Sequence, residues 1–340
     1  MNLIKAIKLL AVNLVVVSAL LVLLEGMLLM IGVKPYTENK KAPIYVQSEK
    51  RFFQKDSLLG YKHCLGGFDF LLKGNYQFSV SHDENTFRKT SNAFESSKEN
   101  RPEIWLLGCS FTYGWSLNDK ETFAWCLQEK LNQYKIVNLG VNGYGTLHFY
   151  LQLKATLEST KEKPEILIVN HADFHHERNI NSYNYNRSIS TWNNFERIKR
   201  PFVETNNYKK LNINYCENKY TPWEISKEYA LAKSFQFKLE RFIDGRKFKT
   251  SKKITTLLLD EIKLLCRQNN IQLLITNVGL KKKFIKDYTL EKNIPFTDIA
   301  VDYRKSEFNN LPHDKHPSAK ANRMYCERIY NFMVIQKMIQ

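Results

Sequence analysis

The chain has 340 residues, of which 43% are hydrophobic and 25% are charged, so it can bury a globular core and is not a disordered polypeptide. Its formal net charge of +17 would attract polyanions, but the lysines are scattered along the chain and the sequence contains no recognisable nucleic-acid-binding motif. We therefore expect no nucleic-acid partner.

The first feature along the chain is an apolar segment. Residues 9–33 are long enough to cross a hydrocarbon core of roughly 30 Å, and Glu25 lies near the far end. Lys5 and Lys8 precede this segment, as in an export signal, and no small-residue cleavage site follows it. We interpret residues 1–34 as an uncleaved, single-pass signal anchor with the body in the periplasm. Lysines beyond the segment nearly balance those before it, so the positive-inside rule favours this orientation only weakly. The alternative to a membrane segment is a buried core helix.

The rest of the chain divides into two regions. Residues 35–101 form a connecting region with short strand-like runs, and residues 102–340 form the main domain. There, short apolar runs alternate with helical patterns, which predicts a parallel sheet with helices on both faces. The predicted strands are 103–107, 136–141, 166–170, 271–276 and 296–300. The predicted helices are 120–131, 146–157, 252–268, 284–290 and 318–338.

An insert interrupts this alternation at about 177–249, where Asn, Tyr, Lys and Phe are frequent and periodicity is weak. We expect it to lie over the face that carries the active site. Its aromatic side chains either stack on sugar rings or pack a small core of their own. They are Tyr183, Tyr185, Trp192, Tyr208, Tyr215, Tyr220 and Trp223.

The six cysteines include no Cys-x-x-Cys pair, which argues against a structural zinc site. Cys126, Cys266 and Cys326 fall in helical patterns, where we expect buried free thiols. A disulfide between Cys64 and Cys216 is an alternative in an oxidising compartment.

Two segments carry chemistry. Gly108–Gly114 directly follows the first predicted strand and presents Ser110 on a turn, where backbone N–H groups can receive an oxyanion. Asp314 and His316 lie two residues apart just before the last helix, so the carboxylate can orient the imidazole while its other nitrogen faces Ser110. Taken alone, the first segment is equally well explained as a structural turn, and the second as a surface cluster of His and Asp.

Together the segments resemble the GDSL/SGNH hydrolase family. Gly108–Gly114 is similar to its nucleophile block with Cys109 in place of Asp, and Asn138–Thr146 is similar to its second block. Asp314–Pro317 is similar to its last block. The resemblance implies the three-layer, flavodoxin-like α/β fold of SGNH hydrolases. It also implies Ser110 as nucleophile, His316 as base and Asp314 as acid, with Gly143, or alternatively Gly140, as an oxyanion donor.

Two positions depart from the family pattern. The family's usual Asp, three residues before the His, is replaced by His313. Ala172 stands where the family has an Asn that donates to the oxyanion, so Asn170, His171 or His175 would have to substitute. The histidine-rich run there also raises a metal site as an alternative, but His175 and His176 are adjacent and would point to opposite faces of a strand. We expect no metal and no cofactor.

The resemblance implies a serine-dependent esterase or acyl transferase that removes acetyl or other acyl groups, from a cell-surface glycan in our interpretation. A lysophospholipase acting on lipid esters is one alternative. The other is a catalytically inactive glycan-binding or assembly protein on the same fold, which the missing Asn favours.

Overall fold

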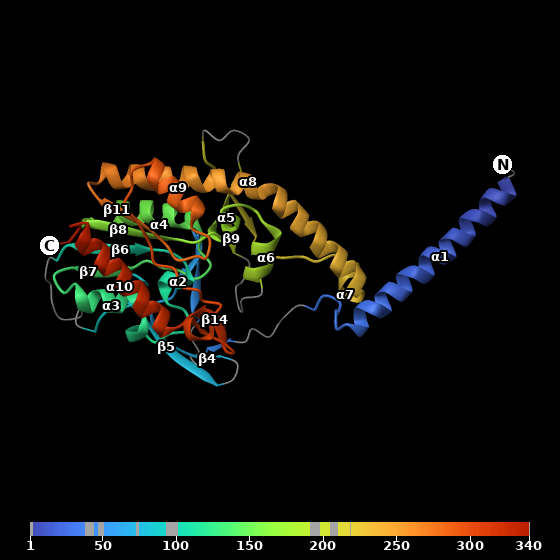
Figure 1. The fold of residues 1–340 in the computed structure, drawn as a ribbon, viewed down its shortest axis with the longest axis horizontal. Coiled ribbons are helices and arrows are strands. Elements are labelled where there is room, and N and C mark those ends of the chain that lie inside the picture. Colours follow the sequence, from blue (N-terminus) through green and yellow to red (C-terminus); the bar gives the residue numbers. More distant parts are fainter. Residues whose placement is uncertain are drawn as a thin grey trace.

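The computed structural model describes residues 3–37, 51–72, 75–92, 101–190, 198–204, 210–217 and 219–339, and the backbone of 44–46. Helix α1 (Leu3–Met30) projects from a body that holds all the other elements (Figure 1). None of its residues is buried, and it is long and apolar enough to cross a membrane. The interpretation of this segment as a buried core helix is therefore wrong.

A five-stranded parallel sheet forms the centre of the body, in the order β12-β11-β8-β6-β7. The strands are β6 (Glu103–Leu107), β7 (Lys135–Asn138), β8 (Ile166–His171), β11 (Gln272–Asn277) and β12 (Phe296–Asp298). Renumbered along the chain, this is the flavodoxin-like order 2-1-3-4-5, with its switch point between β6 and β8. The predicted three-layer α/β fold is confirmed.

Helices cover both faces of the sheet, because its strands are apolar on both sides. Trp105 and Leu107 of β6 face one core, while Ile104 and Leu106 face the other. The first core is closed by α4 (Thr146–Ser159), α8 (Ala230–Gln268) and α9 (Lys283–Glu291). The second is closed by α3 (Phe123–Lys130) and α10 (Ala319–Ile335).

Residues 35–101 contribute strands that pack beside the main sheet. They are β1 (Ile44–Val46), β2 (Phe53–Asp56), β3 (Gly60–His63), β4 (Gly66–Leu72) and β5 (Tyr76–His82). Their aromatic side chains form a third core with Tyr113 and Trp115, which follow Ser110 in the chain. This region therefore supports the nucleophile segment from one side.

The insert contains more regular structure than its sequence predicts. It holds α5 (His175–Arg178), α6 (Tyr183–Ser190), β9 (Lys199–Glu204), β10 (Asn212–Glu217) and α7 (Glu224–Glu228). Helix α8 has 39 residues and begins at Ala230, not at Lys252. The sequence pattern did not predict the first half of this helix. Aromatic side chains occupy two opposite faces there, and only one of these faces is covered by the body.

Helix α1 is attached to the body through Glu25. The Glu25 carboxylate accepts hydrogen bonds from the backbone N–H groups of Ala230 and Leu231, at 2.9 and 2.8 Å. It thereby satisfies N–H groups that the first turn of α8 leaves without helical partners. Just beyond α1, the backbone N–H of Tyr36 donates to the carbonyl of Ser226 on α7.

The prediction of free thiols at Cys126 and Cys326 was wrong, and so was the alternative disulfide between Cys64 and Cys216. Cys126 on α3 and Cys326 on α10 form a disulfide, whereas Cys64 and Cys216 are free thiols. The bonded pair is 200 residues apart, so no spacing in the sequence signals it. The two helices lie side by side on one face of the sheet, which brings the sulfur atoms together. Cys266 is a buried free thiol, as expected.

Candidate active site

Ser110 and His316 are in contact at the carboxyl edge of the sheet. Ser110 begins the short helix α2 (Ser110–Tyr113) directly after β6, and His316 lies on β14 (Asp314–Pro317). The distance from Ser110 Oγ to His316 Nε2 is 2.9 Å, and His316 Nδ1 lies 2.6 Å from Asp314 Oδ1. The switch point between β6 and β8 lies at this edge, and ligands of doubly wound sheets bind at such points. The three side chains form the hydrogen-bonded chain of a serine–histidine–aspartate triad.

Asp314 is held as a carboxylate. Burial raises its pKa, but the charge of His316 and hydrogen bonds from the His316 ring, the His316 N–H and Ser116 lower it more, and the net shift is downward. The His316 backbone N–H donates to Oδ1 at 2.7 Å, and the Ser116 hydroxyl donates at 3.1 Å. An ionised acceptor on Nδ1 leaves Nε2 free to take a proton from Ser110.

A further shell of polar residues, which the sequence did not indicate, positions Asp314. Asn310 Nδ2 donates to the Ser116 hydroxyl at 2.9 Å, and Tyr76 donates to the Ser116 carbonyl at 2.7 Å. Ser116 has a φ of 62°, an uncommon conformation for a residue other than glycine. His313, at the family's usual Asp position, stacks on Tyr76 with a ring-centroid distance of 5.3 Å.

The loop after Ser110 is fixed by Arg88, a fully buried residue that sequence reasoning also missed. Its guanidinium donates to the carbonyls of Tyr113, Gly114 and Leu117. Its Nε pairs with Asp119 at 3.0 Å. A buried guanidinium with acceptors on several sides is well satisfied. This contact links residues 35–101 directly to the nucleophile segment.

The two expected oxyanion donors are the backbone N–H groups of Ser110 and Gly143. That of Ser110 lies at the first position of α2, where no helical carbonyl is available. That of Gly143 lies in a turn with a φ of 82°, which glycine adopts without strain. Gly140, the alternative donor, is engaged, since its N–H donates to Asn138 Oδ1 at 3.0 Å. A Cβ on Gly140 would lie 2.5 Å from the Tyr113 nitrogen, so this glycine permits close packing instead.

Asn170 is used inside the sheet. Its side chain is fully buried; its amide nitrogen donates to the Leu107 carbonyl and its oxygen accepts from Thr276. No group of Asn170 is therefore left facing solvent. The backbone N–H of Ala172 donates to His175 Nδ1 at 3.1 Å, so His175 acts there as an acceptor.

The histidines after β8 are buried beside one another. Ring-centroid distances are 5.6 Å from His171 to His175 and 5.3 Å from His171 to His176. Burial lowers the pKa of His176 to about 4 and those of His171 and His175 well below the usual value. These rings are therefore neutral at pH 7. Within the described ranges, no three His, Cys, Asp or Glu side chains are arranged to hold a metal ion.

The aromatic residues of the insert divide between its interior and its surface. Tyr185 and Tyr220 are buried, and the Tyr185 hydroxyl donates to the Gly143 carbonyl at 2.7 Å. Tyr183, Tyr215 and Trp223 are exposed. Trp192 and Tyr208 lie outside the described residues.

Solved structures with a similar architecture include esterases and a lipolytic protein. They include the psychrotrophic esterase EstA from Pseudoalteromonas sp. (11% identity over 70% of this chain and 99% of that chain, TM-score 0.42). A putative lipolytic protein of the G-D-S-L family from Desulfitobacterium hafniense DCB-2 is 12% identical over 68% of this chain and 99% of that chain, with a TM-score of 0.39. AlinE4, an SGNH-hydrolase family esterase, is 14% identical over 72% of this chain and all of that chain, with a TM-score of 0.36.

No protein-family model and no curated protein matches the chain.

Proposed function

We propose that this protein is a serine-dependent carboxylic ester hydrolase with Ser110 as nucleophile, His316 as general base and Asp314 as the acid that orients the base. The observation that carries the proposal is the unbroken series of contacts from Ser110 Oγ through the imidazole to Asp314, at 2.9 and 2.6 Å. Each partner has the chemistry that its role requires, because a serine hydroxyl is a weak nucleophile until a base removes its proton.

In the proposed reaction, Ser110 Oγ bonds to the ester carbonyl carbon while its proton passes to His316 Nε2. The N–H groups of Ser110 and Gly143 stabilise the oxyanion. Collapse of the intermediate expels the alcohol, which takes the proton from His316 and leaves an acyl-enzyme. Water, activated by His316, then releases the carboxylic acid. An acceptor hydroxyl in place of water would give acyl transfer by the same residues.

We also propose that α1 is a membrane anchor and that the body lies outside the cytoplasm. The carboxylate contacts of Glu25 with α8 support retention of α1, because removing this helix would uncap α8. The Cys126–Cys326 disulfide supports an oxidising compartment, since such bonds are rare in the cytosol. The proposed substrate is an acylated cell-surface glycan, with Tyr183 and Tyr215 exposed on the insert for stacking on sugars. A lipid ester is the alternative.

One observation favours a second function, that of a catalytically inactive binding or assembly protein. Ala172 has no side-chain donor, and the amide of Asn170 is engaged by Leu107 and Thr276. An oxyanion would thus receive one donor fewer than in the related esterases, which costs about a hundredfold or more in rate.

The test is hydrolysis of an acetyl ester chromogen by the full chain in detergent, beside labelling with a fluorophosphonate. Ser110→Ala should abolish both signals, and Ser159→Ala, at the exposed end of α4, should preserve both. Lack of both hydrolysis and labelling in the unmodified protein would exclude the esterase and favour the binding protein. Comparing short-chain with long-chain esters separates a deacetylase from a lysophospholipase.

A further inference from the structure

A row of large apolar side chains is exposed on α7 and the first half of α8. We call it the docking stripe, and it consists of Trp223, Phe235, Leu239 and Phe242. Phe235 and Phe242 are 60% and 62% exposed, although they belong to a regular helix. The Trp223 and Phe235 rings lie 6.1 Å apart, so the stripe continues from α7 onto α8. Exposed aromatic side chains in a row mark an interaction surface more often than isolated ones do.

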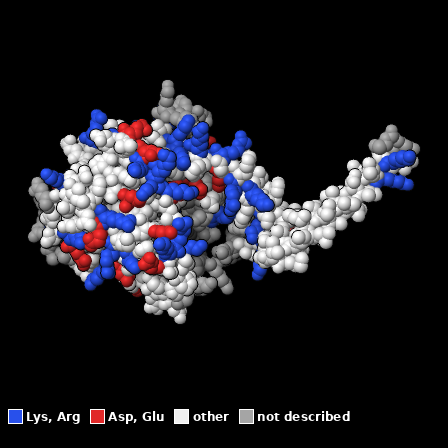
Figure 2. Space-filling view, in the orientation of Figure 1, with Lys and Arg blue, Asp and Glu red and all other residues white. Residues whose placement is uncertain are grey.

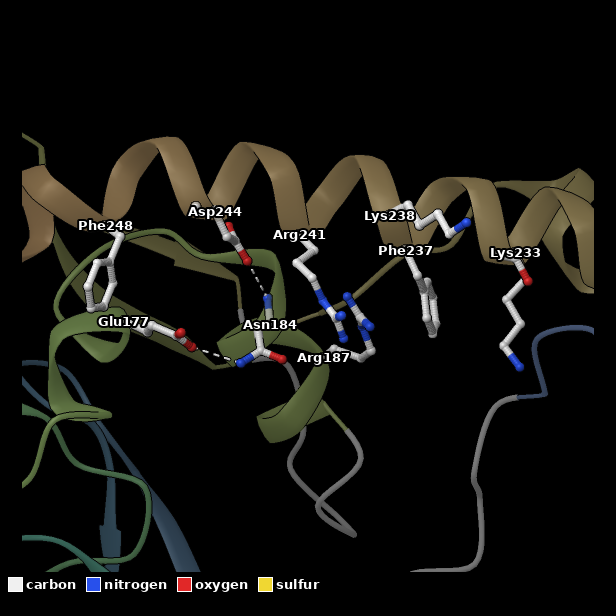
Figure 3. Close-up of a pocket in the computed structure, with 11 residues that line it drawn as sticks. Glu177, Asn184, Arg187, Lys233, Phe237, Lys238, Arg241, Asp244 and Phe248 are labelled. Atoms are coloured by element: carbon white, nitrogen blue, oxygen red, sulfur yellow. Dashed lines mark hydrogen bonds between the residues drawn. The ribbon is translucent and has the colours of Figure 1, made fainter. Parts of the chain in front are cut away.

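The other face of the same helix is occupied, and Figure 3 shows it directed toward α6. There the Arg187 guanidinium lies 3.9 Å from the Phe237 ring centroid. The Asp244 carboxylate accepts from the backbone N–H groups of Tyr183 and Asn184. Successive helical residues are turned by about 100°, so Phe235 points about 200° away from Phe237. The docking stripe therefore faces away from the body.

The stripe begins where α1 ends. Glu25 caps the first turn of α8, and Lys233 Nζ donates to the Lys34 carbonyl at 2.7 Å. In Figure 1, α8 leaves this junction to the side and does not continue the line of α1. If α1 spans a bilayer, the start of α8 lies at the level of the lipid headgroups, because Glu25 is near the end of the apolar segment.

Positive charge accompanies the stripe. Figure 2 shows Lys and Arg side chains on the part of α8 that joins the body to the anchor. Lys238 is turned by about 60° from Phe235 around the helix and flanks the stripe, whereas Arg241 points with Phe237 into a groove of about 520 Å³ between α8 and α6. The Arg246 guanidinium lies 5.9 Å from the Phe242 ring centroid, at the far end of the stripe.

We propose that the docking stripe rests in the headgroup region of an anionic phospholipid bilayer, with Lys238 and Arg246 contacting the lipid phosphates. An apolar helical face with cationic flanks is the pattern of helices that lie in the membrane interface, and tryptophan is enriched at that depth. The proposal depends on α1 being a membrane anchor and is independent of esterase activity. In this arrangement, contact of α8 with the bilayer surface fixes the orientation of the body relative to the membrane.

The test uses the full chain in nanodiscs whose phospholipids carry bromine on the acyl chain near the headgroup. A tryptophan is introduced by Leu239→Trp in the stripe or by Leu264→Trp near the other end of α8. These leucines are matched controls, because they are 37% and 42% exposed on the same helix. The emission added by Leu239→Trp should be mostly lost to bromine quenching, and that added by Leu264→Trp should be retained.

Equal, weak quenching at both positions would overturn the proposal. A blue-shifted but unquenched tryptophan at position 239 would also overturn it and would identify a protein, such as a second copy, as the occupant. Quenching should be stronger with phosphatidylglycerol than with phosphatidylcholine alone, and Lys238→Gln with Arg246→Gln should remove that difference. No lipid difference would exclude the anionic preference. Failure of the chain to co-elute with nanodiscs would exclude the anchor, and the ester assay would report separately on the active site.

Discussion

The hydroxyl of Ser116 donates to the carboxylate of Asp314 at 3.1 Å, although the two residues are 198 positions apart. Ser116 receives a hydrogen bond from Asn310 in turn, so the catalytic acid proposed here is held from the nucleophile side of the fold as well as by its own loop. We predict that this contact orients the imidazole.

Replacing Ser116 should lower kcat and leave KM nearly unchanged, because the residue contacts Asp314 and not the substrate. Hydrogen bonds to charged groups contribute about 1.5–3 kcal/mol, so a loss of about tenfold in kcat is expected. Ser116→Gly and Ser116→Ala both remove the hydroxyl, but only alanine keeps a Cβ at the φ of 62°. Steady-state kinetics should show the same loss in both variants. A loss confined to Ser116→Ala would indicate backbone strain instead.

The second prediction tests Asp314 as the acid of the triad. Asp314→Asn should lower kcat by about a thousandfold or more, because an amide at Nδ1 favours the wrong imidazole tautomer. His313→Gln, at the position where the GDSL/SGNH pattern that the sequence resembles has its Asp, should change kcat little, because His313 stacks on Tyr76 away from the hydrogen-bonded chain. Ester hydrolysis with both variants provides the comparison. The reverse order of effects would show that Asp314 is not the acid.

The Cys126–Cys326 disulfide should stabilise the body. Its loop of 200 residues is long, and the loop-entropy model assigns such a bond about 5 kcal/mol. The double variant Cys126→Ser with Cys326→Ser should therefore unfold at a clearly lower temperature than the oxidised protein, and a reducing agent should have the same effect on the unmodified chain. Cys64→Ser with Cys216→Ser is the control and should leave the unfolding temperature unchanged. Free thiols at 126 and 326 in protein isolated from cells would contradict the bond.

Removing the charge of Glu25 should loosen the junction between α1 and α8. Glu25→Gln keeps the side-chain shape but weakens the cap on Ala230 and Leu231, at a cost of about 1 kcal/mol. Hydrogen exchange of the amides at the start of α8 should accelerate by about fivefold, as expected for a loss of that size. Asn13→Leu, in the exposed middle of α1, should leave those amides protected. Unchanged exchange in Glu25→Gln would show that the cap contributes nothing.

Buried histidines should make the fold sensitive to mild acid. Burial lowers the pKa of both His82 and His176 to about 4, from an ordinary value near 6.5. Between these values the unfolded chain binds protons that the folded chain does not, so stability falls as pH falls from about 6.5 towards 4. Each of these two imidazole rings should lower the free energy of unfolding by about 2 kcal/mol at pH 5.

Thermal unfolding measured from pH 7 to pH 5 tests this expectation. His176→Gln retains a polar partner for Thr255 and should flatten the pH dependence by the contribution of one ring. If the unfolding temperature of the variant falls with pH as steeply as that of the unmodified protein, His176 titrates normally in the folded protein.

Much of the architecture was predictable, because buried parallel strands read as short apolar runs between helical patterns. The predicted strand at 103–107 coincides with β6. The predictions failed where apolar residues serve something other than the core. The first half of α8 was missed because Phe237 faces α6 while Phe235 and Phe242 are exposed. Arg88 and Ser116 were missed because their roles depend on carbonyls and carboxylates supplied by distant parts of the chain.

The local elements, the apolar length of α1 and the chemical types at the sheet edge follow from the sequence alone, because periodicity and composition act over a few neighbouring residues. Which of these groups meet depends on how the whole chain packs. The contact of Ser110 with His316, the pairing of Cys126 with Cys326 and the capping of α8 by Glu25 each join segments about 200 residues apart. Such contacts are set by how the helices and strands pack, and that packing leaves no periodic trace in the chain.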